Sequence, residues 1–336
     1  MWRMIGHAWA AGLLRRHLEA DAVRHAYLLT GPEGVGKRTL AVRMAQAWNC
    51  QKPPAVGDAC GQCRACRGIE AGAYPDLHRL QPEGEGGAIR VEAVRELERM
   101  LALAAYEGRG RVAILDSFHA ATEGAANALL KTLEEPPPRV LMLLTAPAAE
   151  DLLPTVVSRC EVLRLRPVPK EEIERALREE GAPEAEAQWL AAEAGGRPGW
   201  ALRMWRDPKR RQAWAKSVEE IAGLLKAGRS ERLAYAERLI RRWKELPSYE
   251  EKRAALLEHV EPWSGALRQA MRRALGLEAG GGGGQVVDDL ARGGSPETVI
   301  RAVRALEWTT EAVRRNANLQ LALEALLLEL PYSKAA

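Results

Sequence analysis

A glycine-rich segment with one lysine is the first part of the sequence that could do chemistry. It runs Gly31-Pro-Glu-Gly-Val-Gly-Lys37, directly after an apolar stretch and before an Ala-rich stretch of helical character. The glycines Gly31, Gly34 and Gly36 let backbone N–H groups approach phosphate oxygens, and Lys37 can reach the β- and γ-phosphates of a nucleotide. The segment therefore has the pattern and the strand–loop–helix setting of a Walker A phosphate loop.

The residue that should hold a metal ion is absent from this loop. A hydroxyl normally follows the lysine and binds Mg²⁺. Here Arg38 follows, and Thr39 comes one place later. One helix position is a rotation of about 100°, so we expect Thr39 to point away from the metal, and a guanidinium cannot ligate a cation. Two interpretations stay open: weak binding of ATP without efficient Mg²⁺-dependent hydrolysis, or a loop kept only as a scaffold.

A short apolar stretch that ends in an aspartate supplies a second part of a nucleotide site. Val112 to Leu115 predicts a buried strand, and Asp116 follows it where a Walker B aspartate lies near Mg²⁺. Active ATPases of this architecture usually place a glutamate next, to activate water. Here Ser117 follows, and a hydroxyl is a poor general base at neutral pH. Asp116 is thus either part of a degenerate nucleotide site or a residue that caps the strand end.

Four of the five cysteines lie close together in the sequence, at Cys50, Cys60, Cys63 and Cys66. Two C-x-x-C pairs share Cys63, and Cys50 would close the site from the end of a helix. Four thiolates are the ligand set of structural zinc. Disulfides are disfavoured in a cytoplasmic protein, and an iron–sulfur cluster would serve electron transfer, which nothing else in the sequence indicates. We therefore predict a structural zinc site, with Cys160 too distant in sequence to be a ligand.

The elements that must position these groups follow from the spacing of apolar residues. Buried strands are predicted at 26–30, 112–115 and 140–144. Helices are predicted near the N-terminus, at 38–48, at 91–105 and after the N-cap Thr122, and Pro136 stops the last of these. Buried strands that alternate with helices predict an α/β fold with a parallel sheet covered on both faces. The segment Gly57 to Gly68 shows little helical or strand pattern.

Beyond Pro167 only helical periodicity remains. The predicted helices are Glu171–Glu180, Glu184–Ala194, Gln212–Lys226, Arg232–Glu245, Glu250–Leu275, Pro296–Arg315 and Leu319–Leu330. The segment Gly195–Gly199 separates short helices from longer ones, and Gly280–Gly284 predicts a flexible loop. We predict three domains: an α/β domain at 1–167 with the cysteines at 50–66, a small helical domain at 168–206 and a C-terminal helical domain at 207–336.

Composition excludes several classes of protein. The chain has 336 residues, of which 47% are hydrophobic and 28% charged, as in soluble globular proteins. A net charge of +4 is too small for a dedicated nucleic-acid coat. The longest apolar stretch, Val140–Ala149, is shorter than the ~18 residues that cross a bilayer. We therefore expect a cytoplasmic protein. The basic runs Arg206–Arg211 and Arg241–Lys244 either face solvent or contact DNA or a partner.

Several segments occur in an order that resembles the bacterial clamp-loader branch of the AAA+ proteins. They are His25-Ala-Tyr-Leu28, the phosphate loop, the cysteine segment, Asn127-Ala-Leu-Leu-Lys-Thr-Leu-Glu-Glu-Pro-Pro137 and Leu152-Leu-Pro-Thr-Val-Val-Ser-Arg-Cys160. The resemblance extends from Gly6 to Pro167, and the tail from Asn316 to Leu330 resembles the end of that family's helical collar. It implies an AAA+ parallel sheet with a zinc module, a small helical lid and a C-terminal collar through which subunits form a ring.

Within this family the chain resembles the δ′ type more than the motor (γ/τ) type, although both types share the zinc module. Arg38 and Ser117 replace motor residues, and Gly199 stands where the motor lid carries a sensor arginine, with Arg197 out of register. The resemblance implies a largely ATPase-dead subunit of the DNA polymerase III holoenzyme. Its partners would be the γ/τ and δ subunits and, through the complex, the sliding clamp and primed DNA, with no membrane contact. A divergent ATP-hydrolysing motor subunit and a zinc-bearing nucleic-acid binder are the alternatives.

The motif Ser158-Arg159-Cys160 is intact. By itself, Arg159 is one of many surface arginines. In the family, the arginine at this position reaches into the ATP site of a neighbouring subunit, a role that suits a permanently charged planar guanidinium. The resemblance therefore implies that Arg159 acts in trans as an arginine finger. Thr145, near the family's sensor position, is expected only to cap its strand.

Overall fold

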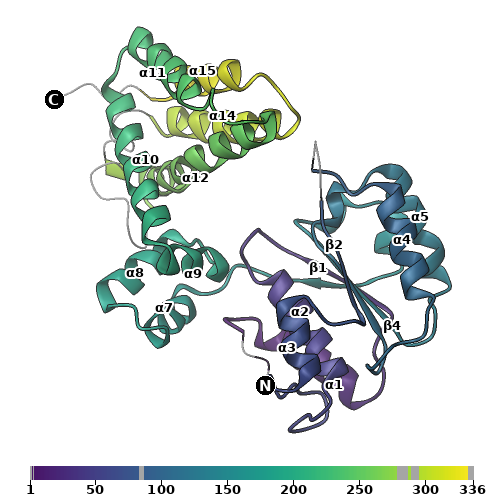
Figure 1. The fold of residues 1–336 in the computed structure, drawn as a ribbon. Coiled ribbons are helices and arrows are strands. Elements are labelled where there is room, and N and C mark those ends of the chain that lie inside the picture. Colours follow the sequence, from purple (N-terminus) through teal and green to yellow (C-terminus); the bar gives the residue numbers. More distant parts are fainter. Residues whose placement is uncertain (1, 3, 83–86, 278–286, 289–294, 332–336) are drawn as a thin grey trace. The chain divides into compact units, whose positions relative to one another are not determined.

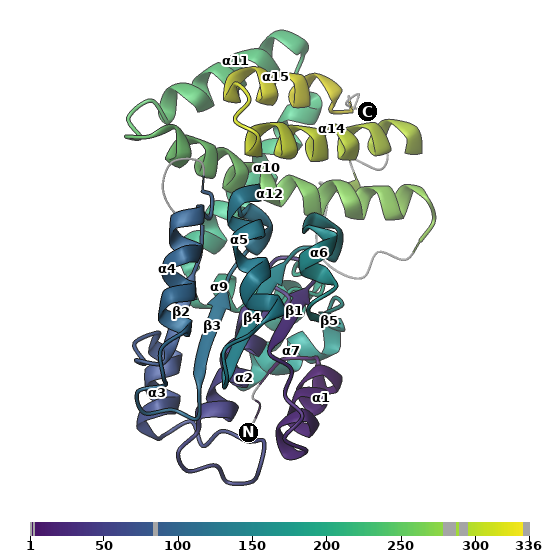
Figure 2. The same ribbon diagram turned by 90° about the vertical axis from the view of Figure 1, so that its right-hand side faces the viewer.

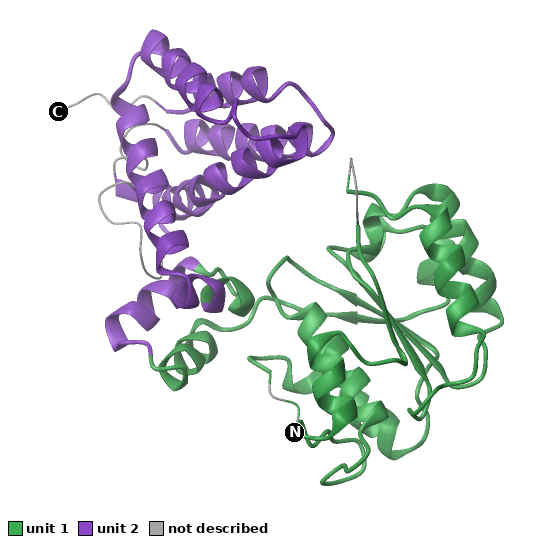
Figure 3. Cartoon of the chain, viewed as in Figure 1, with its two compact units in different colours: residues 1–181, 194–201 green, residues 182–193, 202–336 purple. Residues whose placement is uncertain are grey.

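The structure is a computed structural model of the chain, and it describes residues 2, 4–82, 87–277, 287–288 and 295–331 (Figure 1). Contacts divide the chain into two compact units (Figure 3): residues 1–181 with 194–201, and residues 182–193 with 202–336. The finer division into three domains, at 1–167, 168–206 and 207–336, stays a prediction. The predicted loop Gly280–Gly284 lies outside the described residues.

The first unit contains a five-stranded parallel sheet with the strand order β2-β3-β4-β1-β5. The strands are β1 (Ala26–Thr30), β2 (Leu77–Leu80), β3 (Arg111–Leu115), β4 (Val140–Ala146) and β5 (Glu161–Arg164). Every residue of β1, β3 and β4 is buried, which confirms the prediction of strands covered on both faces. Because parallel strands end at the same edge, the phosphate loop after β1 and Asp116 after β3 come to one edge of the sheet.

Helices cover both faces of this sheet (Figure 2). They are α1 (Ala8–Glu19), α2 (Lys37–Asn49), α3 (Arg64–Ala71), α4 (Val91–Leu101), α5 (Glu123–Glu134) and α6 (Pro154–Val157). The first unit also contains α7 (Lys170–Glu179) and 3₁₀ turns at Phe118–Ala120 and Ala149–Asp151. Alternate strand residues enter two cores: Leu29 and Leu143 pack with α1 and α2, whereas Leu28 and Leu144 pack with α4 and α5. Thr122 caps α5 as predicted, since its Oγ1 accepts a hydrogen bond from the N–H of Ala125 at 3.2 Å.

Several short elements differ from the sequence prediction. The segment Gly57–Gly68 was expected to lack regular structure, but α3 starts at Arg64, where the Cys63 side chain caps it. The edge strands β2 and β5 were not predicted, because both are short and partly exposed and so show no long apolar run. The helix predicted to 105 ends at Leu101. The buried Arg111 bonds to the carbonyls of Leu103 and Ala104, which holds the chain after that helix in another conformation.

The second unit consists of helices, as predicted for the C-terminal half. They are α8 (Glu184–Glu193), α10 (Pro208–Lys226), α11 (Arg229–Arg242), α12 (Tyr249–Ala274), α14 (Pro296–Arg314) and α15 (Leu319–Glu329). Helices α10, α11, α12, α14 and α15 share a core that includes Leu225, Trp263 and Leu323. A further helix, α9 (Pro198–Arg206), begins in the first unit and ends in the second. It was not predicted, because the glycines before and within it suggested a loop, but Pro198 at the first position is compatible with a helix start. No helix in the described part of the chain is long and apolar enough to span a bilayer.

Candidate functional site

The loop between β1 and α2 has the backbone that its glycines allow. Gly31, Gly34 and Gly36 have φ values of 142°, 77° and 116°, which residues with a side chain rarely adopt. Space is also limited, because a Cβ on Gly31 would lie 2.3 Å from the carbonyl oxygen of Leu165. The loop leads into α2, which begins at Lys37. The structure thus places the predicted phosphate loop at a helix N-terminus.

The side chain of Lys37 is folded back over its own loop. Its Nζ donates to the carbonyl oxygen of Gly31 at 2.5 Å and to that of Pro32 at 2.9 Å. Burial lowers the pKa of Lys37. A phosphate would have to compete with these two carbonyl oxygens for the ammonium group.

The phosphate loop is also held by two other segments of the first unit. His7 Nε2 lies 3.0 Å from the carbonyl oxygen of Val35, so the segment before α1 contacts the loop. The N–H of Gly199, at the start of α9, donates to the carbonyl oxygen of Gly34 at 2.8 Å. A Cβ on Gly199 would lie 3.0 Å from that same oxygen. The position where a motor lid would carry an arginine therefore contacts the loop through its backbone.

The carboxylate of Asp116 is bound by two arginines. Arg79 of β2 donates from Nη2 to Oδ2 at 3.0 Å, and Nε of Arg38 lies 3.7 Å from the same oxygen. Two fixed positive charges therefore lie where a metal-binding carboxylate would need its cation. Thr39 is exposed in the first turn of α2. Sequence reasoning missed Arg79 because β2 was not predicted, and the pairing of β2 with β3 leaves no signal in the local sequence.

Ser117 and Thr145 are joined to each other across the same edge of the sheet. Ser117 has a φ of 52°, and its N–H donates to Oγ1 of the buried Thr145 at 2.8 Å. The hydroxyl of Thr145 therefore ties the end of β4 to the turn after β3. This contact agrees with the expected capping role of Thr145.

Arg159 lies after α6, and its hydrogen bonds go to Glu134, Thr155 and Ser158. Nη2 donates to Oε1 of Glu134 at 2.5 Å, and Nη1 donates to the carbonyl oxygen of Thr155 at 2.8 Å. A weaker contact of 3.3 Å joins Nη1 to Oγ of Ser158. The side chain is 32% exposed. The guanidinium is therefore a surface group outside the nucleotide site of its own chain.

The four clustered cysteines converge as predicted. The Sγ atoms of Cys50, Cys60, Cys63 and Cys66 all lie within 4.8 Å of one another, so the cluster could hold a metal ion. Cys60 and Cys66 have their sulfurs 3.9 Å apart. Tetrahedral zinc with Zn–S bonds of about 2.3 Å would place its sulfurs about 3.8 Å apart. The donor set and its spacing thus fit a four-thiolate metal centre.

Backbone N–H groups support the thiolate form of this cluster. The N–H of Cys60 lies 3.2 Å from Cys50 Sγ, and the N–H of Cys66 lies 3.4 Å from Cys63 Sγ. Donors from Gln62 and Cys63 lower the pKa of the Cys60 thiol to about 6, whereas burial raises the pKa of the Cys66 thiol. These surroundings therefore favour the thiolate form of Cys60. The buried Cys66 would need a nearby cation to be present as a thiolate.

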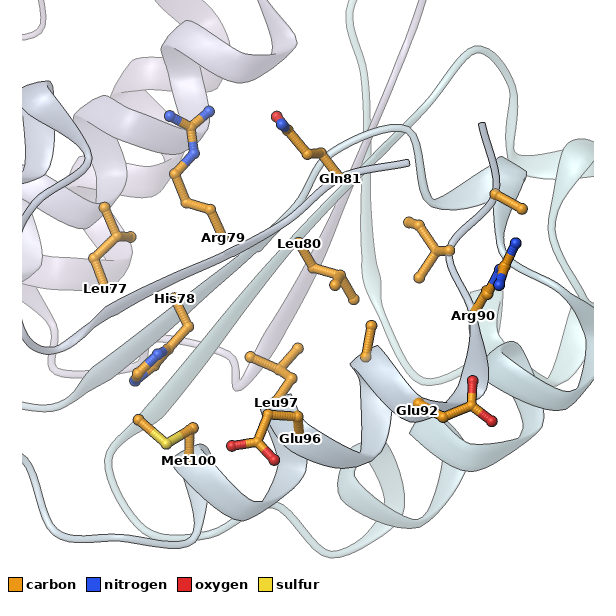
Figure 4. Close-up of a pocket in the computed structure, with 13 residues that line it drawn as sticks. Leu77, His78, Arg79, Leu80, Gln81, Arg90, Glu92, Glu96, Leu97 and Met100 are labelled. Carbon is orange, nitrogen blue, oxygen red and sulfur yellow. The ribbon is translucent and has the colours of Figure 1, made fainter. Parts of the chain in front are cut away.

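A pocket lies along the edge strand β2 and helix α4 (Figure 4). His78 and Leu80 point toward α4, while Leu77 and Arg79 point to the other side of the strand. His78 Nε2 lies 2.9 Å from Nη1 of Arg111, and Arg79 is bound to Asp116. These polar groups are thus engaged in structural contacts, and the sequence motifs do not converge on this pocket.

The strand order, with a phosphate loop after β1 and an acidic residue after β3, is that of the AAA+ type of P-loop fold. A crystal structure of a DNA polymerase III gamma subunit-related protein from Thermotoga maritima has the same fold. It superimposes with a TM-score of 0.51 at 20% sequence identity and covers 95% of this chain and 97% of its own. The predicted fold class is therefore confirmed.

Residues 6–169 match the family model described as DNA polymerase III, delta subunit. The DNA polymerase III subunit δ′ of Pseudomonas aeruginosa is 42% identical over 207 residues, which are 60% of this chain and 62% of that protein. The δ′ subunit of Escherichia coli is 35% identical over 187 residues, 55% of this chain and 56% of that protein. The chain thus spans under two thirds of the length of these relatives. Residues 6–169 are thus similar to a DNA polymerase III family model, and the chain is similar to δ′ subunits over somewhat more than half of its length.

The related motor-type subunit is also similar but covers less. The subunit τ of Escherichia coli is 35% identical over 174 residues, which are 52% of this chain and 26% of that protein. Relatives of both types are thus similar to somewhat more than half of this chain. The degenerate residues at Arg38 and Ser117 are therefore the chemical features that separate the two interpretations.

Proposed function

We propose that this protein is a δ′-like subunit of the bacterial replicative clamp loader. It assembles with γ/τ motor subunits and a δ subunit into a ring, through its C-terminal helical domain. The complex opens the sliding clamp and places it on primed DNA, in the cytoplasm at the nucleoid. The family match of residues 6–169 supports this function, and the δ′ relatives support the choice of subunit.

The subunit does not hydrolyse ATP by itself in this proposal. The observation that carries this point is the state of Asp116, whose carboxylate is bound by Arg79 and Arg38. Mg²⁺ could be ligated there only after both cations were displaced, and Ser117 supplies no general base. The loop residues Gly31, Gly34, Gly36, Lys37 and Thr39 then serve as a scaffold or bind nucleotide weakly.

The proposed metal is structural zinc, held by the four clustered thiolates. When bound, zinc would supply cross-links between the end of α2, the loop after it and the start of α3. Cys50 follows α2, and Cys63 caps α3, so the site joins two helices that also pack on each other. The zinc role is supported by the donor set and its spacing.

Arg159 is proposed to act in trans on the ATP of an adjacent motor subunit. Its exposure, and its separation from the phosphate-loop contacts of its own chain, support this role. We expect the variant R159A to assemble normally and to lower the DNA-stimulated ATPase rate of the reconstituted complex by ten-fold or more, since a finger arginine is worth about 10³–10⁵ at a single site. Native mass spectrometry checks assembly, and a coupled ATPase assay checks the rate. An unchanged rate would refute the finger assignment.

Co-purification tests the function as a whole. The tagged chain, mixed with candidate motor and δ chains, should form a stable hetero-oligomer that stimulates clamp loading on primed DNA. The alternative, a divergent motor subunit, predicts Mg²⁺-dependent ATP turnover by the purified chain that is lost in K37A. Formation of the complex without such turnover supports the δ′-like function; turnover by the chain alone contradicts it.

A further inference from the structure

The guanidinium of Arg159 is bound inside its own subunit by two separate helices. Nη2 donates to Oε1 of Glu134, the last residue of α5, at 2.5 Å. Nη1 donates to the carbonyl oxygen of Thr155 in α6 at 2.8 Å and lies 3.3 Å from Oγ of Ser158. The side chain is therefore held between the end of one helix and the start of another.

This arrangement uses the same N–H bonds that a phosphate would need. Arginine recognises phosphate through the paired N–H bonds of its planar fork. Here both terminal nitrogens already donate to acceptors of the same chain. A triphosphate in a neighbouring subunit could accept hydrogen bonds from both terminal nitrogens of Arg159 only after the contact between Nη2 and the carboxylate of Glu134 had broken.

We propose that Glu134 is a positioning residue for Arg159. The carboxylate of Glu134 binds the guanidinium within its own subunit until the triphosphate of a neighbouring subunit takes the place of that carboxylate. This inference rests on the proposed function of Arg159 in trans. The carboxylate and the phosphate offer the same kind of acceptor, an anionic oxygen, so the exchange keeps the guanidinium paired throughout. Glu134 thereby sets how much ATP is needed to engage the arginine.

The exposure of the pair permits this exchange. The side chain of Glu134 is 51% exposed and that of Arg159 is 32% exposed. Water and salt screen such a pair, so its strength is modest and a more highly charged triphosphate can compete with it. A deeply buried pair, in contrast, would be too costly to break.

The sequence offers a matched control beside Glu134. Glu135 carries the same charge, is also exposed, and lies at the end of the same helix. The fork of Arg159 is bonded to Glu134 rather than to Glu135. Removing the charge of Glu134 or that of Glu135 changes the local electric field similarly, but only the removal at Glu134 breaks the contact with Arg159.

The experiment uses the complete reconstituted complex with the variants E134Q, E134D, E135Q, R159A and E134Q/R159A. The apparent KM for ATP and the kcat of the DNA-stimulated ATPase are measured for each. We expect E134Q to lower the apparent KM by about two- to five-fold, the range of an exposed ion pair, with kcat nearly unchanged. E134D and E135Q should retain the wild-type KM. The double variant should equal R159A alone, because Glu134 acts only through Arg159.

The outcomes separate this inference from the proposed function. If R159A has no effect, the finger assignment and the inference fall together. If R159A lowers the rate but E134Q leaves KM unchanged, raises it or lowers kcat, the trans role of Arg159 is supported and the positioning role of Glu134 is wrong. If the E134Q effect persists in the R159A background, Glu134 is a merely structural residue, which also overturns the inference.

Discussion

Asp116 shows how a few residues can change the chemistry of a whole site. Its strand, its position at the end of β3 and its edge of the sheet are those of a metal-binding aspartate. Arg38 and Arg79 nevertheless place two positive charges on its carboxylate. Because a guanidinium is not a Lewis acid, it balances the charge of the carboxylate but cannot activate water or polarise a phosphate oxygen as Mg²⁺ would. We regard this as the residue-scale basis of the proposal that this chain does not hydrolyse ATP by itself.

Cys63 is the residue at which the metal proposal is most directly tested. It belongs to both C-x-x-C pairs and also caps α3. We expect the purified protein to contain about one equivalent of zinc, and the variant C63S to lose it, because three ligands bind structural zinc much more weakly than four. Metal analysis by mass spectrometry measures both values.

The matched control for this prediction is C160S. Cys160 is outside the cluster of four sulfurs, so this variant should keep the metal. A folded wild-type protein without zinc, or a C63S variant that retains a full equivalent, would contradict the metal assignment.

At the scale of elements, a buried arginine joins helices of the second unit. Arg232 of α11 is 4% exposed, and its guanidinium donates to backbone carbonyl oxygens at the ends of α10 and α15. The acceptors are Leu224, Ala227, Leu327, Leu330 and Pro331. Carbonyl groups at a helix C-terminus lack intrahelical donors and carry partial negative charge, so a cation there satisfies both needs.

We expect R232A to destabilise the second unit by about 3–5 kcal/mol, because buried carbonyl oxygens would lose their donors and a cavity would remain. Denaturant unfolding followed by circular dichroism measures the change. The control R238A removes an exposed arginine from the same helix and should cost less than about 0.5 kcal/mol. Equal effects of the two variants would show that the contacts of Arg232 contribute little.

The edge strands show where element prediction reaches its limit. The central strands β1, β3 and β4 are apolar throughout, so their sequence alone predicts them. In contrast, β2 and β5 contain charged residues and are stabilised by pairing with β3 and β1. Their existence depends on a neighbouring strand that is distant in sequence, which local periodicity cannot reveal.

At the scale of the whole molecule, histidines in both units make stability depend on pH. Burial lowers the pKa of His7 and His78 in the first unit. Burial also lowers the pKa of His259 in the second unit, although the nearby Glu220 opposes the change. His259 is surrounded by Tyr235, Trp243 and Trp263. The charged form of each histidine is therefore disfavoured in the folded state.

The sign of the effect follows from these lowered values. Above pH 6.5 the histidines are neutral in both states and contribute no penalty; below it, the unfolded chain binds protons that the folded chain does not. We expect the free energy of unfolding to fall as the pH drops from 7 through 6.5 towards 5. Urea unfolding at successive pH values measures this slope.

The variant H259Q should reduce the slope for the second unit, because it removes a histidine whose pKa is lowered by burial. A wild-type free energy of unfolding that stays constant between pH 7 and 5 would contradict the prediction. A slope that is the same in H259Q and in the wild type would contradict the part assigned to His259.

The sequence by itself determined the central strands, the helical C-terminal half, the phosphate-loop motif and the four cysteines. It could do so because those features depend on local spacing: apolar runs, helical periodicity, and glycines and thiols at fixed separations. Only the tertiary structure decided which charges meet. Arg79 reaches Asp116 across 37 residues of sequence, and Glu134 reaches Arg159 across 25. Such pairings arise from the order of strands and the positions of helix ends. They decide whether the carboxylate of Asp116 is free to bind a metal ion and whether the guanidinium of Arg159 is free to bind a phosphate.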